Sequence, residues 1–227
     1  MAPPPRARRT VRPLVPARQA RAVRTRSRLI DAARALLVEH GLAGAPTAAV
    51  AARAEVSQGA LFRHFPHKTD LLIAVTEAIL AELRQAFAEE LAPRRGRRRA
   101  AVAPALADPL AAACAALWRV FRRPDMRVVL EIYVCARTDA ELERGLGPVL
   151  DHHQALLLDE ARRLFPLAAA ANPEFGDAVL AIVYAMQGAA IGLFSPDPAA
   201  EVCHLAFLER LARRELARRP TLPAPEA

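Results

Sequence analysis

The chain has 227 residues, of which 53% are hydrophobic and 25% are charged. This length allows one large or two ordinary domains with a buried core, and the composition is that of a globular protein. Its three cysteines, at positions 114, 135 and 203, are far apart and lack metal-ligand spacing, which argues against a disulfide framework or a zinc site and favours a reduced, cytoplasmic setting.

The positive charge is concentrated at the N-terminus. Residues 1–28 contain nine arginines and no acidic residue, so their net charge is +9. The net charge of the whole chain is +8, which leaves −1 for the remaining residues. Prolines interrupt this stretch, so it contains no secretory signal, and we expect residues 1–22 to form a disordered basic arm. A flexible cationic arm suits contact with DNA phosphates or the minor groove; a solubilising tail or a misassigned start codon are the alternatives.

The first regular element is expected at residues 24–40, where apolar side chains recur at helical spacing before Gly41 ends the helix. Its inward face comprises Leu29, Ile30, Ala33, Leu36 and Leu37. The side chains expected outside are Asp31, Arg34 and Glu39. Three polar residues of the first turn are placed to touch a sugar-phosphate backbone: Thr25, Arg26 and Arg28.

Residues 47–65, TAAVAARAEVSQGALFRHF, contain two short helical patterns joined by a tight turn. Ser57 can cap the second helix by accepting hydrogen bonds from its early backbone N–H groups. Leu61 and Phe65 then share one inward face. The first helix buries Val50, Ala51 and Ala54. Thr47 either caps that first helix or binds a phosphate.

The outer face of the second helix combines small residues, an aromatic and a cation. These residues are Gly59, Ala60, Phe62 and Arg63. Small side chains let a helix approach base edges closely, while Arg63 can pair with guanine or phosphate and Gln58 with adenine. The pattern predicts a helix-turn-helix whose second helix enters the major groove of DNA.

Residues 25–75 closely resemble the N-terminal DNA-binding domain of the TetR family of transcriptional regulators. The matching positions are Ala33, Leu36, Leu37, Gly41, Leu42, Val50, Ala51, Val56, Ser57, Gly59, Leu61, Phe62, His64, Phe65, Lys68, Leu71 and Leu72. An ordered set of this length is much more specific than a short motif.

Three positions depart from the family pattern. Phe62 stands where a Tyr is usual, so no phenol can donate to a phosphate. Glu55 stands where a turn Gly is common, at a cost of about 1 kcal/mol if its φ is positive. Gln58 stands where a Lys is frequent, so the charged contact of that Lys with a phosphate is replaced by a possible contact of Gln58 with a base.

The residue pattern and the resemblance together give a set of expected DNA contacts: Arg26, Thr47, Ser57, Gln58, Gly59, Ala60, Phe62, Arg63, His64 and Lys68. Lys68, the only lysine of the chain, matches the family's phosphate-contacting lysine, and a solvated cap is the alternative. We expect His64 to pack or to touch a phosphate and not to act in catalysis.

A long helix is expected from Lys68 to about Leu91, with an inward stripe that could link a DNA-reading head to a body. The stripe is Leu71, Leu72, Val75, Ile79, Leu83 and Phe87. Residues 93–109 then break the pattern with three prolines, one glycine and five arginines. We interpret this segment as a solvated junction between domains; a second nucleic-acid site is the alternative.

The remainder is expected to be helical, without strand alternation or internal repeat. Helices are predicted at residues 110–121 and from Pro124 onward. A third helix should begin at Asp139, be interrupted at Gly145, Gly147 and Pro148, and be followed by a helix at residues 149–165. A further helix should run from an Asn172 cap with Pro173 to Phe194, and a last one should end at about Arg218. The predicted architecture is all-α, with a three-helix helix-turn-helix domain at residues 23–75, a helical ligand-binding and dimerisation domain at residues 76–218, and a disordered tail at residues 219–227.

Residues 178–194 contain no charged side chain. A stretch of this length lies at the lower edge of a membrane span, but a helix buried at a dimer interface explains it better. Small residues there would permit close approach: Ala185, Gly188, Ala189 and Gly192. The resemblance implies a four-helix bundle between two subunits, through residues of about 174–218 and with an apolar stripe of Leu205, Leu208, Leu211 and Leu216.

Catalytic and cofactor motifs are missing from the sequence: it has no P-loop, dinucleotide fingerprint, HExxH or CxxC. His152 and His153 are adjacent on an expected helix and point about 100° apart, so they do not easily share a metal. We expect surface or packing histidines, no enzyme activity, no cofactor and no metal.

A pocket for a hydrophobic small molecule is expected from the resemblance, with plain core packing as the alternative. Its candidate lining is Trp118, Phe121, Met126, Leu130, Tyr133, Met186, Gln187 and Phe194. The sequence therefore predicts a homodimeric, ligand-responsive repressor of a palindromic operator, without membrane contact. The alternatives are a sequence-indifferent DNA-binding architectural protein and a membrane-associated helical protein.

Overall fold

The computed structural model describes residues 17–92, 108–190 and 198–217. Every regular element in these ranges is a helix and none is a strand, which confirms the all-α prediction. The helices are α1 (Ala17–His40), α2 (Thr47–Arg53), α3 (Gln58–His64), α4 (Lys68–Leu91), α5 (Pro109–Phe121), α6 (Pro124–Ala136), α7 (Ala140–Leu164), α8 (Pro166–Ala171), α9 (Phe175–Ala190) and α10 (Pro198–Leu216).

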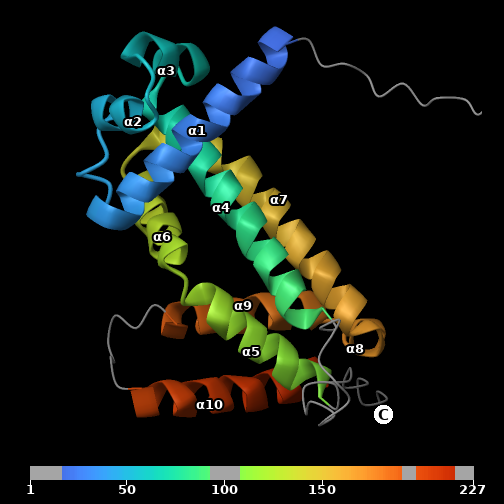
Figure 1. Ribbon diagram of the computed structural model, residues 1–227. Helices are drawn as coiled ribbons and strands as arrows, with labels where there is room; N and C mark the ends of the chain where they lie inside the picture. Colours follow the sequence, from blue (N-terminus) through green and yellow to red (C-terminus); the bar gives the residue numbers. More distant parts are fainter. Residues whose placement is uncertain (1–16, 93–107, 191–197, 218–227) are drawn as a thin grey trace, which may run out of the picture.

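The helices form a small part at one end and a larger part at the other, joined by two long helices (Figure 1). α1, α2 and α3 make the small end, α5, α9 and α10 pack at the far end, and α4 and α7 run side by side between them. The predicted domain boundary after residue 75 falls inside α4, whose buried side chains extend from Leu71 to Leu83. α4 therefore packs on α1 at one end of the molecule and on α5 at the other.

α1 is longer than predicted, because it begins at Ala17. The predicted disordered arm is thus helical over residues 17–22, where Ala, Arg and Gln follow the last proline of the arm and favour a helix. Residues 1–16 lie outside the described residues. At the other end, Gly41 has a φ of 67° and its N–H donates to the Leu37 carbonyl at 3.0 Å, as the predicted helix end requires.

α7 runs without a break from Ala140 to Leu164, so the predicted interruption at Gly145, Gly147 and Pro148 is wrong. Pro148 removes one helical hydrogen bond, but packing along α4 holds the helix together. A Cβ on Gly145 would lie 2.2 Å from the Cδ1 atom of Ile73 on α4. The glycine therefore allows close packing of two helices and does not end one.

The start of α9 also differs from the prediction: a short helix that we did not predict, α8, precedes it, and α9 begins at Phe175. Asn172 still organises this turn. Its Oδ1 accepts from the Glu174 N–H at 3.0 Å, and its Nδ2 donates to the Glu215 carbonyl at 2.9 Å. The buried Asn172 side chain thus ties the start of α9 to the end of α10. The predicted end at Phe194 lies outside the described residues.

α9 and α10 pack against each other, and the inner side of α10 faces this chain's own core. Leu208 and Leu216, predicted as part of a dimer stripe, are buried there, while Leu205 and Leu211 are partly buried. Different apolar side chains of the pair reach solvent: Tyr184 is 55% exposed, Val202 69% and Phe207 57%.

Candidate nucleic-acid interface and cavity

The turn between α2 and α3 has the predicted geometry. The Ser57 Oγ accepts from the Ala60 N–H at 3.1 Å and caps α3, while Leu61 and Phe65 are buried beneath it. Glu55 has a φ of 53°, the only positive value at a non-glycine position in the described ranges. That conformation costs a residue with a side chain about 1 kcal/mol.

Arg28 braces this turn from α1. It donates to the Ala54 carbonyl and to the Glu55 carboxylate, the latter at 3.1 Å. The sequence predicts that Arg28 touches a sugar-phosphate backbone, but the strained turn supplies a carbonyl and a carboxylate within its reach. Its guanidinium is therefore already engaged within the protein.

The outer face of α3 is open. Gln58, Gly59 and Arg63 are exposed, Phe62 is 45% exposed, and a Cβ built on Gly59 would meet no atom within 4 Å. No hydrogen bond or ion pair joins Arg63 to any described residue. Glycine at position 59 is thus not required by the packing of the chain itself, and the face that it opens can approach another molecule closely.

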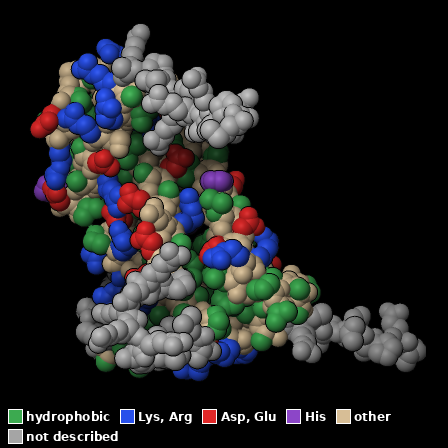
Figure 2. Space-filling view, turned by 45° about the vertical axis from the view of Figure 1, so that its right-hand side comes forward, with side chains coloured by type: hydrophobic (Ala, Val, Ile, Leu, Met, Phe, Trp, Pro, Cys, Tyr) green, Lys and Arg blue, Asp and Glu red, His purple; other side chains and the backbone are tan. Residues whose placement is uncertain are grey.

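The other predicted contact residues surround α3. The Arg26 guanidinium lies 5.1 Å from the centre of the Phe65 ring, and the Lys68 Nζ lies 3.4 Å from the Leu42 carbonyl oxygen. Thr47 opens α2 after Pro46 without a side-chain cap, which leaves phosphate binding as its proposed role. His64 is half-buried. Figure 2 shows Lys and Arg side chains on the end of the molecule that carries α1, α2 and α3.

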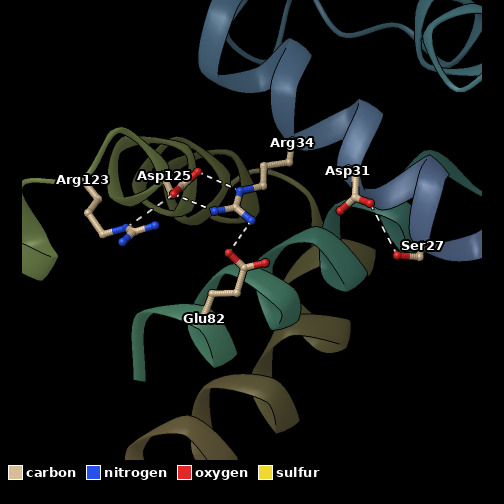
Figure 3. A network of polar contacts seen from close by, with 6 residues as sticks. All are labelled: Ser27, Asp31, Arg34, Glu82, Arg123 and Asp125. Carbon is tan, nitrogen blue, oxygen red and sulfur yellow. Dashed lines mark hydrogen bonds and ion pairs between the residues drawn. The ribbon is translucent and has the colours of Figure 1, made fainter. Parts of the chain in front are cut away.

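A buried ion-pair network joins this end to the rest of the chain (Figure 3). The Arg34 Nε and Nη2 atoms donate to the two carboxylate oxygens of Asp125 on α6 at 2.8 and 2.7 Å, and its Nη1 donates to Glu82 on α4 at 2.6 Å. The Arg34 and Asp125 side chains are only 19% and 11% exposed. The sequence predicts Arg34 on the outer face of α1, which is wrong: the side chain points between α4 and α6, because carboxylates from both helices converge there.

The charges of this network stabilise one another. The hydrogen bonds from Arg34 hold the pKa of the Asp125 carboxyl below its usual range, and Asp125 raises the pKa of the Arg34 guanidinium in turn. Glu131, also on α6, accepts from the Leu42 N–H at 2.8 Å. Two acidic residues of α6 are therefore bound to α1 and to the loop that follows it.

A largely apolar cavity of about 400 Å³ lies between α4, α5, α6, α7, α9 and α10. Four predicted pocket residues line it: Phe121, Met126, Tyr133 and Gln187. Three others do not line it: Trp118 and Met186 are buried in the surrounding core, and Leu130 is half-buried against it. Phe194 lies outside the described residues.

Polar groups that are not among the predicted pocket residues also face this cavity. Arg84 on α4 donates from Nη1 to the Nδ1 of His153 on α7 at 3.0 Å, and both residues line the cavity. Burial lowers the pKa of His153 to about 4, lowers that of Arg84, and raises that of Tyr133 to about 12. His153 was expected to be a surface or packing residue, and no local signal in the sequence indicated its pairing with Arg84.

The described residues hold no cluster of His, Cys, Asp or Glu suited to a metal ion. Among the described helices, none combines the length and apolarity needed to cross a bilayer. The three cysteines are unpaired, and burial raises the pKa of the Cys114 thiol to about 11.

Residues 29–75 match the family described as "Bacterial regulatory proteins, tetR family". An HTH-type transcriptional regulator of Mycobacterium tuberculosis is 31% identical over 195 residues, which cover 85% of this chain and 95% of that protein. The HTH-type transcriptional regulator CymR of Pseudomonas putida is 30% identical over 139 residues, 61% of this chain and 64% of CymR.

Solved structures share the fold along most of the chain. The multidrug binding protein EbrR complexed with ethidium has a TM-score of 0.58 and 26% identity, over 82% of this chain and 97% of EbrR. A TetR family member from Streptomyces coelicolor has a TM-score of 0.57 and 26% identity over the same shares. Together with the capped helix-turn-helix and its open outer face, these matches show that the chain belongs to the TetR family of transcriptional regulators.

Proposed function

We propose that the protein is a homodimeric repressor that binds a roughly palindromic operator in the cytoplasm and is released by a hydrophobic small molecule. The observation that carries the DNA part is the outer face of α3, where Arg63 has no partner among the described residues and Gly59 leaves room for a base edge. Arg63 would read guanine and Gln58 adenine, while Arg26, Thr47 and Lys68 would contact phosphates.

A dimer is supported by the exposed apolar side of the α9 and α10 pair, which carries Tyr184, Val202 and Phe207. Gly188 on α9 has open space beside it, so a second helix can come close. Two copies would then present two α3 helices to successive major grooves, about 34 Å apart along one side of the duplex.

Effector control is supported by where the cavity lies relative to the ion-pair network. Asp125 pairs with Arg34, and the next residue, Met126, lines the cavity. Glu82 pairs with the same arginine, and its neighbour Leu83 also lines the cavity. A ligand that displaces α4 or α6 would therefore shift both partners of Arg34 and tilt α1, which changes the spacing of the α3 helices. EbrR, a relative in fold, has been solved with ethidium and with proflavin.

The proposal is tested by selecting fragments of host genomic DNA that bind the purified full-length protein. Fluorescence anisotropy then compares a selected fragment with a random duplex of equal length at fixed salt. We expect the selected fragment to bind at least about 1,000-fold more tightly, as specific sites do. Equal competition by random DNA would instead indicate a sequence-indifferent architectural protein.

A further inference from the structure

The cavity contains a charge that its own walls do not neutralise. Arg84 lines it, and no carboxylate of the described residues forms an ion pair with its guanidinium. Glu77, two turns earlier on α4, acts on Arg84 only through space and is itself exposed. Glu160 lines the cavity as well, but its carboxylate is bound by Arg163, with one contact at 2.8 Å.

The hydrogen-bond partner of Arg84 defines what the pair can offer a ligand. A guanidinium can only donate, so the His153 Nδ1 must accept, and the proton of the neutral ring sits on Nε2. The lowered pKa of His153, about 4, keeps the ring neutral near pH 7. Arg84 and His153 therefore present only N–H donors to the cavity, with one full positive charge.

The surroundings make that charge selective. Most of the wall is apolar. Leu83 and Phe87 line the cavity from α4, as Arg84 does, and Leu157 lines it from α7, as His153 does. Water stabilises a partly buried guanidinium less well than an exposed one, so an anion gains more there than at the surface. A flat carboxylate matches the planar fork of an arginine better than a neutral hydroxyl does.

We propose that the cavity selects an amphiphilic carboxylate, with an apolar body among the aliphatic and aromatic walls and its carboxylate on Arg84 and His153. This inference rests on the proposed effector role of the cavity and specifies the chemistry of its ligand. It also separates this protein from a receptor for organic cations such as ethidium, which Arg84 would repel.

The test uses three linear probes of ten carbons each: decanoate, 1-decanol and decylammonium. Calorimetry on the full-length protein at pH 7.5 measures each affinity below the concentration at which the probe aggregates. We expect decanoate to bind at least about tenfold more tightly than decanol, and decylammonium to bind most weakly. A ranking with decanol or decylammonium first would overturn the proposal without any variant.

Variants then assign the preference to a residue. Arg84→Gln should bring decanoate and decanol to equal affinity, while Arg84→Lys, which keeps the charge but not the fork, should retain part of the preference. Arg144→Gln removes an exposed arginine of α7 that does not line the cavity, and it should change nothing. An undiminished preference in a folded Arg84→Gln protein would overturn the assignment.

Operator binding is measured in the same series to separate two kinds of failure. A wild-type protein that binds a selected DNA fragment but shows no preference for decanoate over decanol overturns the ligand proposal alone. A protein that binds decanoate through Arg84 but binds no genomic fragment more tightly than random DNA overturns the proposed repressor function. The carboxylate site would then still stand.

Discussion

Arg63 and Arg84 both lack a carboxylate partner among the described residues, but they lie in opposite surroundings. Arg63 is exposed on α3, and Arg84 is half-buried in an apolar cavity. An exposed arginine stays hydrated and is screened by salt, so it suits a polyanion that offers many contacts at once. A half-buried arginine has lost part of its water, so a single ligand charge is worth more beside it. The two proposals thus assign one type of charge to two kinds of recognition.

A third arginine, Arg34, has both its charge and its hydrogen bonds satisfied, and it gives the largest expected effect. Asp125→Ala would leave Arg34 largely buried beside only the half-exposed Glu82, and we expect a loss of about 3 kcal/mol in the free energy of unfolding. Urea denaturation measures this loss. The double variant Arg34→Leu with Asp125→Leu should recover much of it, because no unpaired buried charge remains.

A loss below about 0.5 kcal/mol for Asp125→Ala, which is the scatter of ordinary surface substitutions, would contradict this description of the network. The same variants should also weaken the response of operator binding to any ligand of the cavity, since Asp125 is adjacent to Met126 in the cavity wall.

The exposed arginine gives the next largest effect. Arg63→Ala should weaken binding to a selected operator by about 2 kcal/mol and binding to random DNA much less, because a base contact is lost in addition to a charge. Anisotropy at fixed salt measures both. Arg162→Ala, at the far end of α7, removes the same charge from an exposed site and is the matched control. Equal losses on the two DNAs would show that Arg63 contacts phosphate only.

The cap of α3 has a smaller expected effect. Ser57→Ala removes the acceptor for the Ala60 N–H and should lower the stability by about 1 kcal/mol. Ser57→Thr keeps a hydroxyl acceptor and should lose less. Thermal unfolding ranks the three proteins, and an Ala variant as stable as the wild type would argue that water replaces the cap.

A last expected effect depends on pH and concerns His153. Its pKa is lowered from 6.5 to about 4 in the folded chain, so between these values the unfolded chain binds a proton that the folded chain excludes. Stability should therefore fall as the pH falls through this window, and less so in His153→Asn. Melting temperatures at pH 7 and pH 4.5 test the sign, and a wild type that gains stability relative to the variant on acidification would contradict the buried neutral ring.

The difference between local and distant contacts explains what the sequence could predict. Ser57, Leu61 and Phe65 were placed correctly because a cap and a helical face depend on residues within a few positions. For Glu55 the signal was the family resemblance, because a turn Gly is common at this position, and its φ is positive. Along these stretches, spacing alone defines which side chains are buried.

Contacts between distant residues could not be predicted in this way. Arg34 was placed outside because its partner Asp125 lies far along the chain, and Arg84 received no role because only the packing of α4 on α7 brings it to His153. From the sequence, Gly145 indicated the end of a helix, whereas in the fold it leaves room for the Ile73 side chain. In each case the deciding atom belongs to another helix.

The most direct test of the central claim is a hydroxyl-radical footprint of the full-length protein on a selected operator. We predict two protected half-sites on one face of the duplex, with centres about 34 Å apart, both weakened together in Arg63→Ala. A single protected patch, or protection spread evenly along the DNA, would contradict the insertion of two α3 helices into successive major grooves.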